Sequence, residues 1–181
     1  MTLQELLTGA LQQLDRGTDA QTLEAWRDKL TRFLNDAIVD LSATLRPRRT
    51  DAVEIADGRI DLSLLPRRCV KVLALCRGHV RDPFYYGLGT DLLHVPAVAD
   101  GPAELTYRYL PAQLSADTDR PDLPWDCDGA LIQYAVGRER AAGDGTSIAA
   151  ARACFELYNM MKQNLRSGRG ECDAYRFENR Y

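Results

Sequence analysis

The spacing of hydrophobic positions changes twice along the chain and separates two helical regions from a region of strands. Up to residue 46, leucines and other apolar residues recur every three or four positions, which predicts helices over 2–16 and 18–46. Both helices open with capping-box spacing, in the pairs Thr2–Glu5 and Thr18–Gln21. Pro47 ends the second helix because proline has no backbone N–H to donate.

Between residues 52 and 110 the hydrophobic period falls to two, which predicts an inserted antiparallel sheet. Asp57 and Gly58 separate two alternating runs and tolerate the positive φ that a two-residue type I′ turn needs. The expected register pairs four aliphatic side chains on one face, Ile55 with Ile60 and Val53 with Leu62. A lone hairpin is marginally stable, so we expect further strands at 69–76 and 104–110 and a second hairpin at 84–95.

A proline-rich acidic corner over 111–124 follows the last predicted strand and leads into two more helices. Asp122 is placed to cap a helix over 124–142 whose first turn holds Pro124. Thr146 is expected to cap the last helix, over 146–165, after a connection short enough to make the two helices antiparallel neighbours. Residues 166–181 lack apolar periodicity and are predicted to form a C-terminal tail.

Composition and charge narrow the class of protein. At 181 residues, with 45% hydrophobic and 27% charged residues, the chain is typical of one globular domain, which we place at 1–165. A DNA-binding regulator that inserts a helix pair into the major groove stays an alternative, but the net charge of -3 argues against it. The start of the chain lacks signal-peptide features, and no apolar run reaches the roughly 20 residues of a membrane span, so we expect a cytosolic protein without membrane contact.

Candidate catalytic and metal-binding residues are few. His79 and His94 lie in no nucleophile motif, and the aspartates after Asp117 lack the glycine and glutamate of a calcium-binding EF-hand loop. A tail-associated hydrolase stays an alternative because spacing alone does not exclude Glu104 or Glu139. Five unpaired-looking cysteines are interpreted as reduced thiols: Cys69, Cys76, Cys127, Cys154 and Cys172. We expect no catalytic residue, no cofactor and no metal.

Two features of the sequence are considered as contact sites for other molecules. The first, the basic runs at 46–50 and 66–68, is interpreted as solvated ends of elements rather than as phosphate sites. The tail interleaves aromatic residues with arginines, the types enriched at interface hot spots, and we favour a segment that orders on a partner. Its residues are Tyr175, Arg176, Phe177, Arg180 and Tyr181.

Four quoted stretches, with the order of the elements, resemble a known family. They are "DGRIDLSLLP", "YRYLP", "DLPWDCDGALIQYAVGRERA" and "GDGTSIAAARACFELYNMMKQNL". Together they resemble the head-to-tail adaptor (connector) proteins of tailed bacteriophages, from the first helix to about Leu165. The resemblance implies an α+β, mainly α fold, in which a bundle of about four helices carries a small inserted antiparallel sheet and an extended C-terminal tail.

The same resemblance implies a non-enzymatic virion protein of the neck, assembled in the host cytoplasm as a dodecameric ring beneath the portal. Its partners would be other copies of itself, the portal protein, a downstream tail or stopper protein, and DNA that passes through the lumen without sequence-specific binding. The C-terminal tail would bind the portal. A ring subunit needs exposed apolar faces, and the candidates for subunit or tail contact are the first helix and the hairpin residues Phe84, Tyr85, Tyr86, Leu88 and Leu92.

Overall fold

The computed structural model divides the chain into two compact units, each with its own hydrophobic core. The helical unit consists of Met1–Leu45 and Ala112–Tyr181, and the sheet unit is Arg46–Pro111. The structure describes residues 1–78, 80–87, 90–96, 99–123, 125–143 and 145–170. The predicted fold class, mainly helical with a small inserted antiparallel β component, is confirmed.

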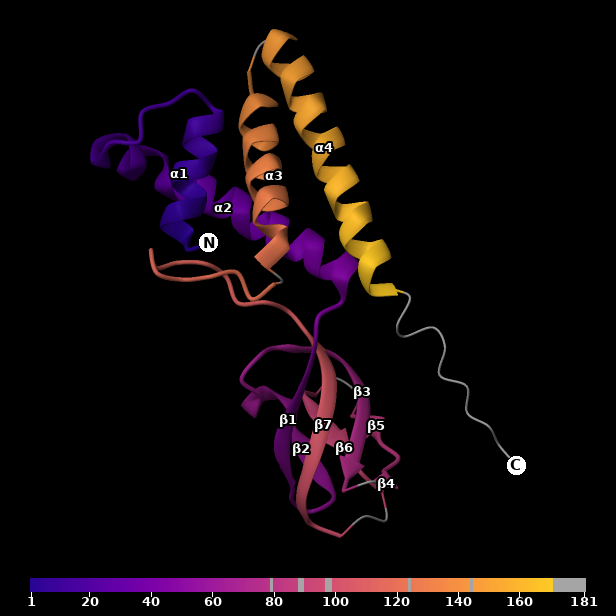
Figure 1. The fold of residues 1–181 in the computed structure, drawn as a ribbon. Helices are drawn as coiled ribbons and strands as arrows, with labels where there is room; N and C mark the ends of the chain where they lie inside the picture. The colour runs from indigo at the N-terminus through magenta and orange to yellow at the C-terminus, as the bar shows by residue number, and fades with distance from the viewer. Residues whose placement is uncertain (79, 88–89, 97–98, 124, 144, 171–181) are drawn as a thin grey trace. The chain divides into compact units, whose positions relative to one another are not determined.

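Four α-helices build the helical unit (Figure 1). They are α1 (Leu3–Gln13), α2 (Ala20–Leu45), α3 (Asp128–Arg140) and α4 (Gly145–Gly170), with a short 3-10 helix, η2 (Trp125–Cys127), before α3. α3 and α4 lie side by side and run antiparallel, as the short connection between them predicts. α4 is longer than the sequence indicated and continues past Leu165 to Gly170.

Side-chain hydrogen bonds fix where the first two helices begin. The predicted capping box of α1 is confirmed: Thr2 N–H donates to the Glu5 carboxylate at 2.7 Å, and Glu5 N–H donates to the Thr2 hydroxyl at 3.3 Å. In α2 the predicted cap at Thr18 is wrong by one position. Asp19 accepts from Thr22 N–H at 3.0 Å and from the Thr22 hydroxyl at 2.7 Å. A carboxylate at this place also suits the positive end of the helix dipole.

The predicted caps of the last two helices are also wrong. α3 begins at Asp128, because the 3-10 turn η2 occupies the positions before it, and its N-cap residue, Cys127, makes no capping side-chain bond. Asp122 therefore lies too far from α3 to cap it, and Pro124 falls outside the described residues. α4 begins at Gly145, so Thr146 belongs to the helix itself.

The core of the helical unit takes side chains from all four helices. Most are aliphatic, and α4 contributes the buried side chains of Cys154 and Tyr158. The apolar residues of α1 are at most 2% exposed, and they are Leu3, Leu6, Leu7, Ala10 and Leu11. α2 contributes Leu30, Leu34 and Leu41, each fully buried. Because the leucines of α1 pack inside their own unit, packing accounts for the apolar character that made this helix a contact candidate.

The acidic corner holds the helical unit together through main-chain groups. Its carbonyls at Asp119 and Asp117 accept from the first N–H groups of α1, at Leu3 (2.8 Å) and Gln4 (3.3 Å), which have no partner within a helix. The side chain of Asn35 in α2 bonds both main-chain groups of Leu114, accepting from its N–H at 2.8 Å and donating to its C=O at 3.0 Å. Leu114 itself is buried in the core. The corner thus packs α1 and α2 against each other.

Replacing Asn35 by alanine is expected to destabilise the helical unit by about 2 kcal/mol, because two hydrogen bonds are lost and two main-chain groups of a buried residue lose their partner. Denaturant unfolding followed by circular dichroism measures the loss. Asn35→Asp keeps the acceptor and should lose about half as much. The exposed neighbour Asp36 provides the control, since Asp36→Ala should change little; equal losses in all three variants would contradict the role of Asn35.

A polar cluster joins α2 to α4. The Tyr158 hydroxyl donates to the Asp40 carboxylate, and Lys162 Nζ lies 2.5 Å from the same oxygen. Burial by itself raises the pKa of Asp40, but the bonds from Lys162 and Tyr158 outweigh it, so the pKa is lowered. Burial, helped by the Asp40 charge, raises the pKa of Tyr158 and keeps it a donor at neutral pH.

The sign of the Asp40 shift predicts an acid-sensitive contribution to stability. A carboxyl whose pKa is lower in the folded state stabilises the fold above its ordinary pKa of about 4 and loses this contribution as pH falls through the lowered value. Asp40→Asn should therefore lower the free energy of unfolding by about 1 kcal/mol at pH 7, since the carboxylate is partly solvated. The difference from wild type should shrink below about pH 4; a difference independent of pH would refute the assignment.

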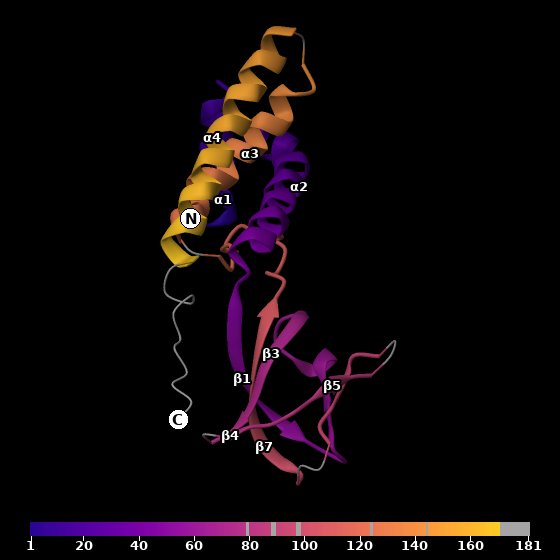
Figure 2. The same cartoon turned by 90° about the vertical axis from the view of Figure 1, so that its right-hand side faces the viewer.

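The sheet unit contains two antiparallel sheets rather than the single sheet predicted (Figure 2). One has the order β1-β7-β3-β4 and the other β2-β6-β5. The first is made of β1 (Arg48–Ile55), β7 (Gly101–Tyr109), β3 (Cys69–Arg77) and β4 (Val80–Arg81). The second is made of β2 (Arg59–Asp61), β6 (Leu92–His94) and β5 (Tyr85–Tyr86), and the short helix η1 (Leu62–Leu64) follows β2.

The predicted turn at Asp57 and Gly58 is confirmed, with φ values of 52° and 66°. Ala56 and Arg59 exchange main-chain hydrogen bonds of 3.0 and 2.9 Å across it, which is the predicted register. β1 and β2 do not continue to pair with each other beyond this bridge, because β1 pairs with β7 and β2 pairs with β6. The four predicted aliphatic side chains still share one core.

Tyr107 is the largest fully buried side chain of the sheet unit. In the four-stranded sheet it is paired with Arg49 of β1 on one side and with Val72 of β3 on the other. Its hydroxyl donates to Asp51 at 2.6 Å. Arg49 Nε bonds the same carboxylate at 2.7 Å. Burial, together with the neighbouring Asp51, raises the pKa of Tyr107, so it stays a neutral donor. The core of this unit thus forms around one aromatic ring with a satisfied hydroxyl.

Candidate interaction surfaces

The second hairpin, β5 and β6, presents aromatic side chains to solvent. Tyr85 and Tyr86 are 56% and 48% exposed. Phe84 and Leu92 are half-buried, and Phe84 packs against the core of the sheet unit. The strands pair Tyr85 with His94 and Tyr86 with Leu93. Leu88, the remaining predicted contact residue of the hairpin, falls outside the described residues.

The exposed rings are held in place by their neighbours. Tyr85 stacks on His94, with ring centroids 5.1 Å apart and an interplanar angle of 8°, and Tyr86 meets Phe84 edge-on at 6.3 Å. Val72 N–H in β3 donates to the Tyr86 hydroxyl at 2.5 Å. Burial raises the pKa of that hydroxyl more than the Val72 bond lowers it. Rings fixed in this way lose little entropy when a partner covers them.

The structure describes most of the predicted contact residues of the hairpin but none of those in the C-terminal tail. All five tail residues, Tyr175, Arg176, Phe177, Arg180 and Tyr181, lie outside the described residues, and portal binding by them stays a prediction. The hairpin is described except for Leu88 and residue 89. Sequence reasoning missed the other exposed apolar side chains of the sheet unit, Leu64, Val70 and Val80, which are 82%, 65% and 65% exposed.

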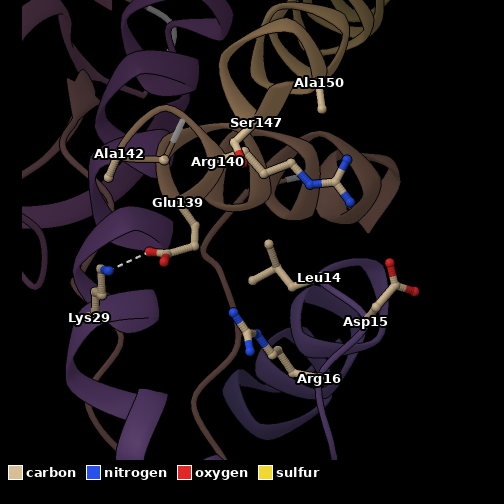
Figure 3. A pocket seen from close by; sticks show the side chains of 10 residues that line it. Leu14, Asp15, Arg16, Lys29, Glu139, Arg140, Ala142, Ser147 and Ala150 are labelled. Carbon is tan, nitrogen blue, oxygen red and sulfur yellow. Dashed lines mark ion pairs between the residues drawn. The ribbon is translucent and has the colours of Figure 1, made fainter. Parts of the chain in front are cut away.

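A hollow of about 520 Å³ in the helical unit contains Glu139, one of the two glutamates raised for hydrolysis (Figure 3). Its side chain is 16% exposed, and its carboxylate lies 2.5 Å from Lys29 Nζ. Asp15 lines the same hollow, but its carboxylate is turned away from Glu139. Glu139 thus forms a structural ion pair, whereas glycoside hydrolysis uses two carboxyl groups facing one bond. The other glutamate, Glu104, is exposed on β7 of the sheet unit.

The aspartates of the acidic corner bind protein groups. Asp117 pairs with Arg27, and Asp119 accepts from Ser115 N–H and Ala116 N–H, both at 2.8 Å. These main-chain bonds lower the pKa of Asp119. Asp128 contacts the N-terminal amine at 2.6 Å. Turn formation and ion pairing account for the carboxylates of Asp117 and Asp119 in the corner and of Asp128 at the start of α3.

Other candidate chemistry can be placed only in part. Within the described part of the chain, no group of three or more metal-ligating side chains gathers. Cys69, Cys76, Cys127 and Cys154 form no disulfide, while Cys172 and His79 fall outside the described residues. Among the helices that the structure covers, none has both the length and the apolar character to cross a membrane.

Comparison with known proteins assigns the chain to a protein family. The model of a family described as "SU10 adaptor protein" matches residues 1–171, which include both units as far as the end of α4. A search of curated proteins found no match. The resemblance to head-to-tail adaptor proteins of tailed bacteriophages is thereby confirmed. The chain belongs to the SU10 adaptor protein family.

Proposed function

We propose that this protein is a head-to-tail adaptor that forms a dodecameric ring beneath the portal, continues the DNA channel and provides the site to which the tail attaches. The observation that carries the proposal is the family match over residues 1–171, which takes in both units. Membership in this family supports a phage adaptor protein with a structural role, and the absence of enzymatic activity is part of the proposal. Ring, channel and attachment site are the parts proposed here.

The distribution of apolar surface supports a docking role. Among the described residues, nine large hydrophobic side chains are exposed, and five of them belong to the sheet unit: Leu64, Val70, Val80, Tyr85 and Tyr86. That unit is only 66 residues long, so its surface is richer in such side chains than that of the helical unit. Exposed aromatic and aliphatic groups on rigid strands are typical of interaction sites.

The contacts divide between two partners. The C-terminal tail, with Tyr175 and Phe177 among its residues, binds the portal, while the hairpin of β5 and β6 contacts the downstream tail or stopper protein or a neighbouring subunit. DNA passes through the lumen of the ring without sequence-specific recognition. The ring assembles in the host cytoplasm and ends in the neck of the virion.

Co-purification with the cognate portal protein tests the proposal. The full chain should elute with the portal as one large complex, and a chain ending at Gly170, which keeps all of α4, should elute mostly apart from it. A truncated chain that binds with full affinity would remove the tail from the mechanism. A full chain that never joins the portal would contradict the proposed function.

A further inference from the structure

One edge of the four-stranded sheet is long and open. β1 (Arg48–Ile55) stands at the end of the order β1-β7-β3-β4 and pairs with β7 along all eight of its residues without a bulge (Figure 2). On its other side the structure describes only the bridge from Ala56 to Arg59, just beyond the strand. An edge strand of this length is a template on which another strand can pair.

The direction of the main-chain groups in β1 follows from the residues at its two ends. The Pro47 carbonyl accepts from the last N–H of β7 at 3.2 Å, whereas Ala56 exchanges its hydrogen bonds across the turn to β2. Successive residues of a strand direct these groups to alternate sides, so Thr50, Ala52 and Glu54 direct theirs away from β7. None of these groups has a partner among the residues that the structure describes.

The side chains of β1 leave this edge accessible. Thr50, Ala52 and Glu54 are all exposed. Edge strands are commonly blocked by proline, lysine or a bulge, and β1 has none of the three. Asp51, which points into the sheet unit, already accepts from the Tyr107 hydroxyl at 2.6 Å. Pairing with a further strand would therefore expose no new unsatisfied carboxylate.

A second copy of β1 is the strand that fits this edge. The other edge strands that the structure describes are β4, β2 and β5, which have two, three and two residues. Antiparallel pairing of two β1 strands about Ala52 sets Ala52 opposite its own copy and Thr50 opposite Glu54 of the second copy. All three open positions then exchange hydrogen bonds, the two Glu54 carboxylates stay apart, and the smallest side chains meet at the centre.

We propose that the free protein forms a twofold dimer in which the β1 edges of two copies pair antiparallel and join their four-stranded sheets into one. This goes beyond the proposed function. A surface that meets its own copy makes a twofold contact, whereas the subunits of a cyclic ring meet through two different surfaces. The paired state therefore belongs to the protein before the ring forms, and the copies separate when they join the portal.

Sedimentation equilibrium of the full chain over a range of concentrations tests the proposal. Wild type should form a dimer that dissociates on dilution. Ala52→Lys should stay monomeric at the same concentrations, because it sets two ammonium groups opposite each other at the centre of the contact. It should keep the wild-type circular dichroism spectrum, since Ala52 directs its main-chain groups away from β7.

Val80→Lys is the matched control, because Val80 is also exposed but lies on β4, the opposite edge of the same sheet. It should keep the dimer. A wild-type chain that stays monomeric, or that forms a larger species unaffected by Ala52→Lys, would overturn the proposal. Equal dissociation of both variants would overturn it as well, since added charge rather than the β1 edge would then be the cause.

Crosslinking provides an independent measure of the register. A short bifunctional maleimide should join two copies of Ala52→Cys, since these residues lie opposite each other. Thr50→Cys should crosslink no more than wild type, because each step of two residues from the centre carries the two copies of a position further apart. Wild type measures the background from the native cysteines. Crosslinking of Thr50→Cys as efficient as that of Ala52→Cys would contradict the pairing.

Portal co-purification keeps this proposal separate from the proposed function. Ala52→Lys should still join the portal, because the β1 pair is absent from the ring. A folded Ala52→Lys variant that no longer joins it would place the β1 edge inside the ring and overturn the twofold dimer. A wild-type chain that never joins the portal contradicts the proposed function, whatever sedimentation shows.

Discussion

Replacing Tyr107 by alanine should unfold the sheet unit and leave the helical unit folded. The side chain is fully buried at the centre of its core, and removing a buried aromatic ring costs about 3–5 kcal/mol. A unit of 66 residues buries too little surface to have that much stability to spare. Hydrogen exchange should show β3 and β7 losing protection while α2 and α3 keep theirs, because the two cores share no residue.

Tyr107→Phe is the matched control. It keeps the ring and removes only the hydroxyl bond to Asp51, which Arg49 still partners, so the expected loss is about 1 kcal/mol and the strands stay protected. If Tyr107→Ala left the exchange of β3 and β7 unchanged, the ring would not be the centre of this core. If it also exposed α2, the two cores would unfold together rather than separately.

Replacing Tyr85 by alanine should weaken the proposed contact between the adaptor ring and the downstream tail protein by about thirty-fold, the effect of losing about 2 kcal/mol at a hot spot. The aromatic ring of Tyr85 is exposed and already ordered by its stack on His94. A partner would therefore cover it at little entropic cost. Affinity of the purified portal–adaptor complex for the tail protein, measured by surface plasmon resonance, provides the number.

Met160→Ala is the control for this experiment, because Met160 is as exposed as Tyr85 but lies on α4. It should leave tail-protein affinity unchanged. If the Tyr85→Ala variant no longer formed an oligomeric ring before the tail protein was added, the hairpin would lie between subunits. If the Tyr85→Ala variant formed an oligomer of normal mass and bound the downstream tail protein with normal affinity, the hairpin would not be a docking site.

Local signals in the sequence predicted much of the fold. The Asp57–Gly58 turn was predictable because few residue pairs accept two successive positive φ values. Apolar periodicity likewise located all four helices. Helix starts were less predictable: Thr18 and Asp19 are both good caps, and only the structure shows which side chain meets Thr22 N–H. Strand partners depend on distant residues, so the division into two sheets had no local signal.

The candidate surfaces were predictable to different degrees. Hairpin aromatics stand out in sequence because Phe84, Tyr85 and Tyr86 are consecutive. The exposed side chains Leu64, Val70 and Val80 do not, because the sequence alone gives no sign of which apolar positions the folded unit leaves uncovered.

Electron microscopy of the purified portal mixed with this protein is the most direct test of the central claim that the chain is an adaptor. The account predicts a second ring, coaxial with the portal and built from this subunit, with the C-terminal segment of each copy against the portal. Portal particles that carry no added ring at saturating protein concentration would contradict it.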